Sequence, residues 1–224
     1  PSTPLPPPQN QVFGEIALLE ETTRTASATA FEPSLVLSIT MEKFRSLTQV
    51  FPEFTDIMEP LLRERTSNTL KTFPMFSDLA KETRDLVGEM LQFNSFPKGM
   101  NVMTDGMKDD GLHLLIDGQV EVTKIGAEDG KTYELGVVEK GSTIGELSLL
   151  AGINRTATLT ALEPCRTLSM SQVNCRALFS VAPELMDKMV DLGRERRQKT
   201  VEAMGEANAN IPRIDETKES KLRL

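Results

Sequence analysis

Apolar residues recur with two different periods along this chain, and the change of period divides it into segments. Between Asn94 and Val138, short apolar runs alternate with polar residues and are interrupted by turn signals such as Lys98-Gly99 and Asp117-Gly118. A period of two is typical of strands with one buried face, and such pairs are typical of the turns between them. Residues 158–170 also have strand character, so the pattern predicts a small antiparallel roll.

Helical spacing appears on both sides of this roll. Apolar residues three and four apart predict helices over 41–50, 52–62, 173–179 and 183–192, and a capped helix start at Ser77 and Asp78. Residues 29–39 are apolar and rich in β-branched side chains, which predicts strands. The expected fold class is therefore α+β and mainly β, with an antiparallel, jelly-roll-like β-roll flanked by helices.

One stretch within the predicted roll carries candidate chemistry. Residues 144–158 contain Gly145 and Glu146, then a short apolar turn, then Arg155 among small residues. Glycine permits close approach of the backbone, and a helical turn that starts there presents N–H groups to an anion. Arg155 suits a phosphate, whereas the Glu146 carboxylate suits hydroxyl groups because it only accepts hydrogen bonds. A ligand with one phosphate beside a ribose hydroxyl satisfies both residues.

The same pattern occurs earlier in the chain. Gly14, Glu15, Arg24 and Thr25 each precede their counterparts in the later stretch by 131 residues. Further positions repeat at this offset without a gap, which indicates two copies of one fold. The chain therefore divides into a proline-rich, disordered lead-in over 1–12, a truncated first domain with a connecting helix over 13–72, a complete second domain over 73–199, and a polar, disordered tail over 200–224. One complete copy thus follows the C-terminal half of another.

Composition narrows the range of partners. The formal net charge is −8, which argues against nucleic acid, and no apolar run is long enough for a membrane span. Two cysteines make no disulfide framework, which fits a reducing, cytoplasmic compartment. His113 is the only histidine. We expect it to be a surface residue or a hydrogen-bonded strand residue, and we expect neither a metal cofactor nor a metalloenzyme.

The stretch from Gly145 to Ala157 resembles the phosphate-binding cassette of cyclic-nucleotide-binding domains, which occur in cAMP- and cGMP-dependent protein kinases and in cyclic-nucleotide-gated channels. The resemblance implies that Glu146 holds the ribose 2′-hydroxyl and that Arg155 pairs with the cyclic phosphate, while backbone amides complete the site. The candidate ligand-binding residues are therefore Gly145, Glu146, Leu147, Ser148, Arg155, Thr156 and Ala157.

This resemblance also implies a function. The chain would be a regulatory module without catalysis of its own, with cAMP or cGMP as ligand. Binding would move the helices after Met170 and would regulate a protein kinase catalytic domain or another effector. Thr156 resembles the cGMP-kinase pattern, in which this hydroxyl bonds the guanine amino group, although cAMP-responsive relatives also carry Arg-Thr-Ala.

The first copy is expected to be a degenerate, inactive site. Gly14, Glu15, Arg24 and Thr25 are present, but the strands that would wall a pocket are missing from the sequence before them.

Two departures from the family pattern leave alternatives open. Many members stack an aromatic residue over the purine, but none follows Phe179 here. Arg194, Arg196 or Leu192 is a candidate lid, and the Arg-Glu-Arg triplet at 194–196 is otherwise a solvated helix face. Together with the truncated first copy, this supports an alternative function as a scaffold or interaction module that binds no nucleotide. A transcription factor of the catabolite-activator type is disfavoured, because the residues after the last helix show no helix-turn-helix.

Overall fold

The computed structural model describes residues 12–14, 17, 27–51, 53, 64–108 and 111–214. The chain forms two compact units, Pro1–Arg65 and Thr66–Leu224. The division falls before the expected boundary at residues 72 and 73, because Leu70 and Phe73 are buried in the main core of the second unit. The segment that joins the two sequence repeats therefore belongs structurally to the second one.

Helix α2 (Met41–Val50) is the one complete helix among the described residues of the first unit. Thr40 caps it by accepting a hydrogen bond of 3.3 Å from the Lys43 amide, and Phe44 is its buried residue. The predicted helix over 41–50 is thus confirmed. The helix predicted over 52–62 lies outside the described residues except for Glu53.

The strands predicted over residues 29–39 are wrong. This segment has no regular secondary structure, and Leu35 and Leu37 are each 94% exposed. The counterparts of these residues in the second unit pair with other strands on both sides. No strand occurs among the residues described in the first unit, so the segment has no edge on which to form a ladder.

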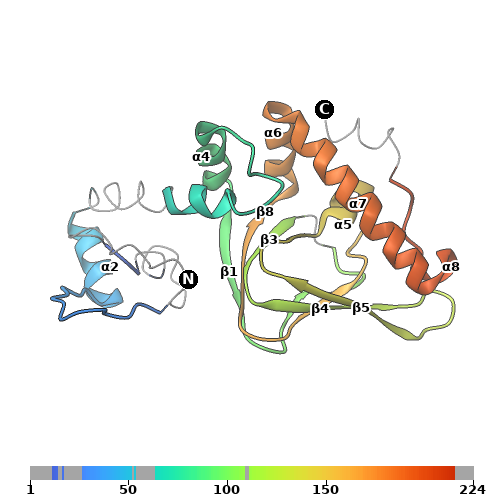
Figure 1. Ribbon diagram of the computed structural model, residues 1–224, viewed down its shortest axis with the longest axis horizontal. Coiled ribbons are helices and arrows are strands. Elements are labelled where there is room, and N and C mark those ends of the chain that lie inside the picture. The colour runs from blue at the N-terminus through green and yellow to red at the C-terminus, as the bar shows by residue number, and fades with distance from the viewer. Residues whose placement is uncertain are drawn as a thin grey trace. The chain divides into compact units, whose positions relative to one another are not determined.

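The described part of the second unit contains two four-stranded antiparallel sheets (Figure 1). One sheet has the order β1-β8-β3-β6 and the other has the order β2-β7-β4-β5. The strands are β1 (Gln92–Phe96), β2 (Asn101–Met103), β3 (Leu112–Asp117), β4 (Gln119–Ile125), β5 (Thr132–Glu139), β6 (Thr143–Ile144), β7 (Thr158–Ala161) and β8 (Cys165–Met170). The predicted roll is confirmed.

Two hydrophobic clusters hold this roll together. The smaller cluster lies between the sheets, with Leu115 of one sheet packed among Val120 and Leu159 of the other. The larger cluster joins the outer face of the β1-β8-β3-β6 sheet to the helices, with Leu114 and Leu168 packed against Met186. The alternation of side chains along β3 explains both clusters, because Leu114 and Leu115 point to opposite faces of the sheet.

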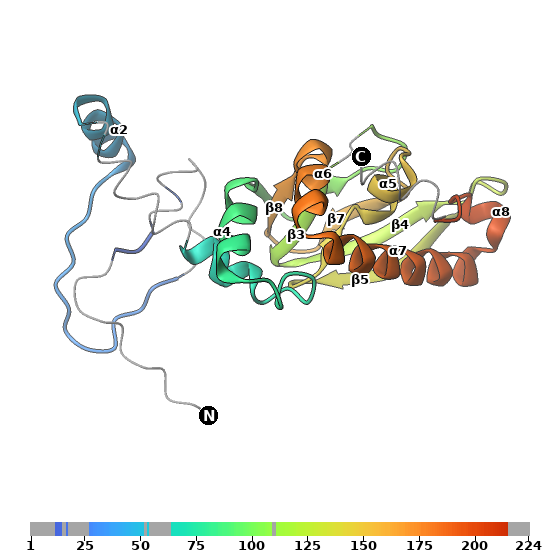
Figure 2. The ribbon, with the colours of Figure 1, turned by 90° about the horizontal axis from the view of Figure 1, so that it is seen from above.

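In the described part of the second unit, five helices with assigned ends accompany the strands: α4 (Lys81–Glu89), α5 (Glu146–Ala151), α6 (Gln172–Val181), α7 (Pro183–Met204) and α8 (Glu206–Ala209). Helix α4 begins at Lys81 and not at Ser77, because the Ser77 hydroxyl donates to Pro74 O in a turn and Ala80 takes the capping position. Figure 2 shows α7 running along the roll, with α8 at its far end beside the β4–β5 hairpin.

Helix α7 also extends far beyond the expected end at Leu192. The expected domain end at residue 199 falls inside α7, and the expectation of a disordered tail is wrong for residues 200–214. Thr200, Met204 and Ala209 are buried, so this polar-looking segment has an apolar face that packs onto the unit. Residues 215–224 lie outside the described part of the chain.

Candidate functional site

A cavity of about 520 Å³ opens in the second unit between β4, β5, α5 and α7. All seven candidate ligand-binding residues line it. Its size lies within the range of about 300–1,000 Å³ that is common for small-molecule sites. The apolar part of its lining includes Val122, Leu135 and Val137, which suits the face of a flat heterocycle.

Gly145 sets the shape of the cassette. It precedes α5 with φ 91° and ψ 3°, a left-handed conformation that glycine adopts without strain. A Cβ atom at this position would lie 2.2 Å from Arg155 Nη1 and 2.8 Å from Gly111 O. Both the dihedral angle and the space therefore require glycine.

The Arg155 guanidinium lies against this turn and is buried, with the residue 3% exposed. It donates hydrogen bonds to Gly111 O at 2.7 Å, to Ser148 Oγ at 2.9 Å and to Gly145 O at 3.3 Å. The Arg155 backbone is also fixed, because its N–H donates to Met107 O at 2.9 Å. A cation held in this way at a cavity wall is preorganised for an anion.

The Glu146 carboxylate lies in the same cavity wall and is 2% exposed. It accepts a hydrogen bond of 2.7 Å from Arg196 Nη1, and Arg196 also donates to Thr143 O at 2.5 Å. One arginine of α7 therefore ties that helix to α5 and β6. Burial of a carboxylate is costly unless it has a partner, and Arg196 is that partner for Glu146.

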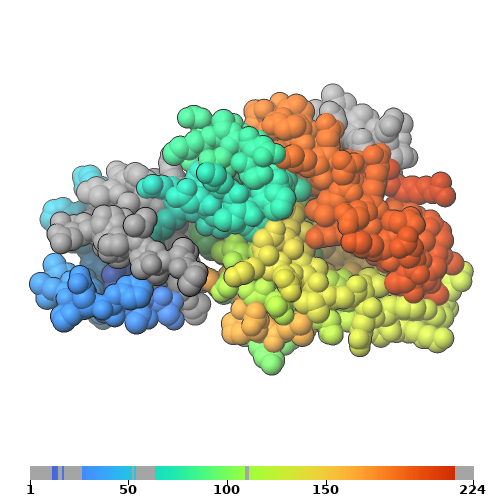
Figure 3. All heavy atoms as spheres, in the orientation of Figure 1, coloured from blue at the N-terminus to red at the C-terminus, as the bar shows by residue number. Residues whose placement is uncertain are grey.

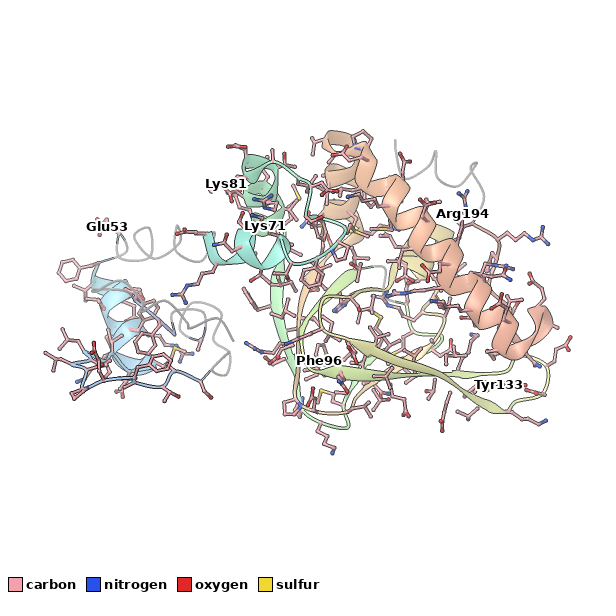
Figure 4. All side chains as sticks on the ribbon, in the orientation of Figure 1. Glu53, Lys71, Lys81, Phe96, Tyr133 and Arg194 are labelled. Carbon is pink, nitrogen blue, oxygen red and sulfur yellow. The ribbon has the colours of Figure 1, made fainter. Side chains whose placement is uncertain are left out.

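The structure corrects the expectation for the Arg-Glu-Arg triplet. Arg196 is partly buried and binds Glu146, so it belongs neither to a solvated face nor to a free lid. Arg194 is exposed on α7, on the side away from the strands (Figure 4). Leu192 packs against the main core instead of the cavity.

Three further side chains at the cavity, and one behind it, were missed by the sequence reasoning. Lys199 and Thr200 of α7 and Ile211 after α8 line the cavity, although they had been assigned to the domain end and the tail. Lys124 of β4 is 7% exposed and donates to Thr156 O at 2.6 Å, which holds the segment after Arg155. No local motif marks these residues, because each reaches the cavity through a contact distant in sequence.

The first sequence copy can be placed only in part. Gly14 is described and has φ 79°, as expected for the glycine of such a turn. Glu15, Arg24 and Thr25 lie outside the described residues.

His113 is buried, and its Nδ1 lies 3.2 Å from Thr167 Oγ1, so it is a satisfied strand residue. In the described ranges, no group of three His, Cys, Asp or Glu side chains could hold a metal ion. None of the described helices is long and apolar enough to span a membrane.

Comparison with known proteins identifies the class to which this fold and cavity belong. Residues 8–50 and 93–181, more than half of the chain, match the family model of the cyclic nucleotide-binding domain. The chain belongs to this family. The match also covers the part of the first unit that contains the earlier sequence copy.

Two similar proteins are a regulatory subunit of a cAMP-dependent kinase and a cGMP-dependent kinase. The chain is 28% identical over 151 residues to the cAMP-dependent protein kinase regulatory subunit of Yarrowia lipolytica, covering 66% of this chain and 37% of that protein. It is 26% identical over 205 residues to cGMP-dependent protein kinase isozyme 1 of Drosophila melanogaster, covering 91% of this chain and 26% of that protein. The chain therefore spans less than two fifths of the length of either relative.

Solved structures share the fold. Cyclic AMP-bound PfPKA-R (141-441) has a TM-score of 0.55 and 23% identity, covering 93% of this chain and 65% of that one. A regulatory subunit of a cAMP-independent protein kinase A from Trypanosoma cruzi, bound to guanosine, has a TM-score of 0.57 and 19% identity, covering 75% of this chain and 57% of that one.

Proposed function

We propose that the second unit binds a cyclic nucleotide, cAMP or cGMP, and acts as a regulatory module without catalysis of its own. The observation that carries this proposal is the presence of Arg155 and Glu146, both almost fully buried, in the wall of one cavity of about 520 Å³. A buried guanidinium and a buried carboxylate in the wall of one cavity can recognise a ligand with both an anionic and a hydroxyl-bearing group.

In the proposed complex, the cyclic phosphate accepts hydrogen bonds from N–H groups of Arg155 and of the first turn of α5. The ribose 2′-hydroxyl donates to Glu146. The purine lies against the apolar lining from β4 and β5. Burial of the purine face and the charge-assisted bonds together provide the affinity.

The same geometry supports a route by which binding reaches the rest of the chain. The Glu146 carboxylate would bond both Arg196 of α7 and the ribose hydroxyl of the ligand. Ligand binding therefore changes the strength of the ion pair that holds α7 to α5. A ligand shifts such an equilibrium only by its difference in affinity for the two arrangements. Because the similar proteins are a kinase regulatory subunit and a cGMP-dependent kinase, we propose a protein kinase catalytic domain as the effector.

Isothermal titration with cAMP, cGMP and guanosine tests the proposal. We expect saturable binding of a cyclic nucleotide, with affinity reduced at least about 100-fold by Arg155→Ala, since a charge-assisted bidentate contact is lost. Arg176→Ala is the matched control, because Arg176 is an exposed arginine of α6 that bonds Gln172. Equal affinity of both variants for the cyclic nucleotide would contradict the proposed site. If guanosine bound with the same affinity as cGMP, the phosphate would contribute nothing to the affinity.

One observation favours a second candidate function, a scaffold that binds no nucleotide. Arg155 and Glu146 already have protein partners in the cavity wall, so the fold is satisfied without a ligand. The melting temperature separates the two candidates, because a ligand that binds only the folded state must raise it. An unchanged melting temperature at millimolar cAMP and cGMP would support the scaffold.

A further inference from the structure

The chain turns back after α7, and one residue of the returning segment, Ile211, lines the cavity. We define the C-terminal strap as residues 205–214, which comprise α8 and the residues that follow it. Gly205 with φ 80° ends α7, and Asn210 with φ 45° ends α8, so the chain changes direction at two residues with positive φ angles. Ile211 is then 5% exposed and lines the cavity.

One side chain of the strap fastens it to the turn between β4 and β5. Asn208 Oδ1 accepts hydrogen bonds from the backbone N–H groups of Glu128 at 3.1 Å and Asp129 at 3.2 Å. The backbone carbonyl of Asn208 accepts a third hydrogen bond, from the Ala127 N–H at 3.0 Å. Three consecutive amides of the turn therefore bond to one residue. Figure 3 shows the red end of the chain lying directly against the yellow-green hairpin.

Hydrogen bonds within the β4–β5 turn and a glycine at residue 126 leave space for the Asn208 side chain. Tyr133 Oη donates to Asp129 Oδ2 at 2.7 Å, and the Lys131 N–H donates to Asp129 Oδ1 at 3.0 Å, which holds the turn closed. A Cβ atom on Gly126 would lie 3.0 Å from Asn208 Oδ1 and 2.2 Å from Asp129 Oδ1. Tyr133 lies on the hairpin close to α8 (Figure 4), and Asn208 Nδ2 lies 3.5 Å from its Oη.

A second fastening holds the other end of the strap. Arg197 of α7 donates from Nε to Ile211 O at 2.9 Å and to Pro212 O at 3.1 Å, and its guanidinium pairs with Glu206. A Cβ atom on Gly193 would lie 2.8 Å from both Ile214 Cδ1 and Leu150 Cδ1, so the strap extends along α7 as far as α5. Ile211 is thus held at its own carbonyl by Arg197, three residues after the fastening at Asn208.

We propose that Asn208 is a positioning residue that locks the C-terminal strap onto the β4–β5 turn and so holds Ile211 across the cavity. This inference rests on the proposed nucleotide site and adds a determinant of how fast the ligand leaves it. With the strap fastened, Ile211 covers part of the apolar lining that the purine would use. Release of the ligand then requires the strap to open, and the two side-chain hydrogen bonds of Asn208 act together with the Arg197 contacts to limit how often it opens.

Dissociation kinetics of the full chain test this role. Asn208→Ala and Ile211→Ala should each raise the dissociation rate constant of cAMP or cGMP about tenfold, because each loses a fastening or a contact of ordinary strength. If Asn208 acts through Ile211, the double variant should dissociate no faster than Ile211→Ala alone. Gln198→Ala, at an exposed α7 position that bonds Glu202, should leave the rate unchanged.

Thiol labelling of Ile211→Cys tests the lock without any nucleotide. The native thiols of Cys165 and Cys175 are buried, so the new thiol dominates the reaction. We expect slow labelling in the Ile211→Cys chain and labelling about tenfold faster when Asn208→Ala is added, since local opening exposes the residue.

The two readouts separate failure of this inference from failure of the proposed function. Faster labelling in a chain that binds no nucleotide would refute the nucleotide site and leave the lock intact. An unchanged labelling rate would overturn the lock even if nucleotide binds. Faster labelling with an unchanged dissociation rate would show that Ile211 does not retain the ligand, which also overturns the proposal.

Discussion

At the scale of residues, the cassette depends on how closely Arg155 approaches the backbone at Gly145. The guanidinium donates to the Gly145 carbonyl and to Ser148 Oγ, so a phosphate would meet an arginine that is already oriented. Orientation before binding reduces the entropy lost on binding. The absence of a side chain at residue 145 is therefore as much a part of the site as the charge at residue 155.

Gly145→Ala should abolish nucleotide binding and lower stability by about 2–5 kcal/mol, since a positive φ angle costs roughly 1–2 kcal/mol and overpacking adds about 1–3 kcal/mol. Gly141→Ala is the matched control. Gly141 has φ 88°, close to the 91° of Gly145, but a Cβ there would meet nothing within 4 Å. Urea unfolding and titration of both variants measure the difference, and equal losses would show that close approach at Gly145 is unimportant.

The hydrogen-bonded pair Tyr133 and Asp129 makes the β4–β5 turn measurable by titration. The hydrogen bond to the Asp129 carboxylate is the largest of the effects that raise the pKa of Tyr133, and that pair also helps to lower the pKa of Asp129, after the Lys131 amide. A raised tyrosine pKa contributes stability that is present below pH 10.0 and is lost as pH rises through the folded value. The lowered Asp129 pKa contributes stability that is lost as pH falls below 3.8.

Ultraviolet titration of the phenolate can measure this directly, because Tyr133 is the only tyrosine and the chain has no tryptophan. We expect the pKa of Tyr133 to lie above its ordinary value of 10.0 in the folded chain and to be lower in Asp129→Ala, where only desolvation still raises it. Circular dichroism at each pH confirms that the chain is still folded. An identical pKa in both chains would show that the bond between Tyr133 and Asp129 does not form in solution.

The cassette residues could be predicted because they are contiguous, and the residues that support them could not. Gly145, Glu146 and Arg155 lie within one short stretch whose spacing carries the chemistry. Arg196 and Ile211 reach the same cavity only through the path of α7, so no local pattern marks them. At this scale, sequence reasoning finds a motif and misses the contacts made by folding.

At the scale of elements, periodicity located the strands and helices of the second unit but not their ends. The alternation in β3 and the spacing in α6 were sufficient, because each element has one buried face. Helix α7 was predicted too short because its last turns are mostly polar, with burial limited to residues such as Thr200 and Met204. The wrong prediction of strands over 29–39 is the opposite case. There the residues have β propensity, but no described strand lies beside them to pair with.

Helix α7 is held to α5 through Arg196, which gives a prediction at this scale. Arg196→Ala should destabilise the second unit by about 1–3 kcal/mol, because the buried Glu146 carboxylate loses its partner. Arg194→Ala on the exposed side of the same helix should change stability by less than about 0.5 kcal/mol. Chemical denaturation compares the two variants. Equal stability of both would mean that Glu146 does not depend on Arg196, and the proposed link between ligand and helix would lose its basis.

At the scale of the whole molecule, the two units differ in where the hydrophobic clusters of the described residues lie. Both hydrophobic clusters of the described chain draw their members from Leu70 onward, so the second unit has its own core. The repeat of 131 residues was readable because it is unbroken, and the match of residues 8–50 to the family model agrees with it. What the repeat could not reveal is that residues 29–39 form no sheet, in a unit whose described residues include no strand to pair with.

We therefore expect nucleotide binding to reside in the second unit alone. A chain that begins at Thr66 should keep the melting temperature of the full chain within about 2 °C, since its core includes no described residue before Leu70. At a nucleotide concentration about 100 times the dissociation constant, both chains should gain about 2.7 kcal/mol of stability and rise equally in melting temperature. Titration of the full chain should give one site, because the described residues of the first unit include no strand that could wall a cavity. Two sites in the full chain and one in the shortened chain would instead show that the first unit completes a pocket of its own.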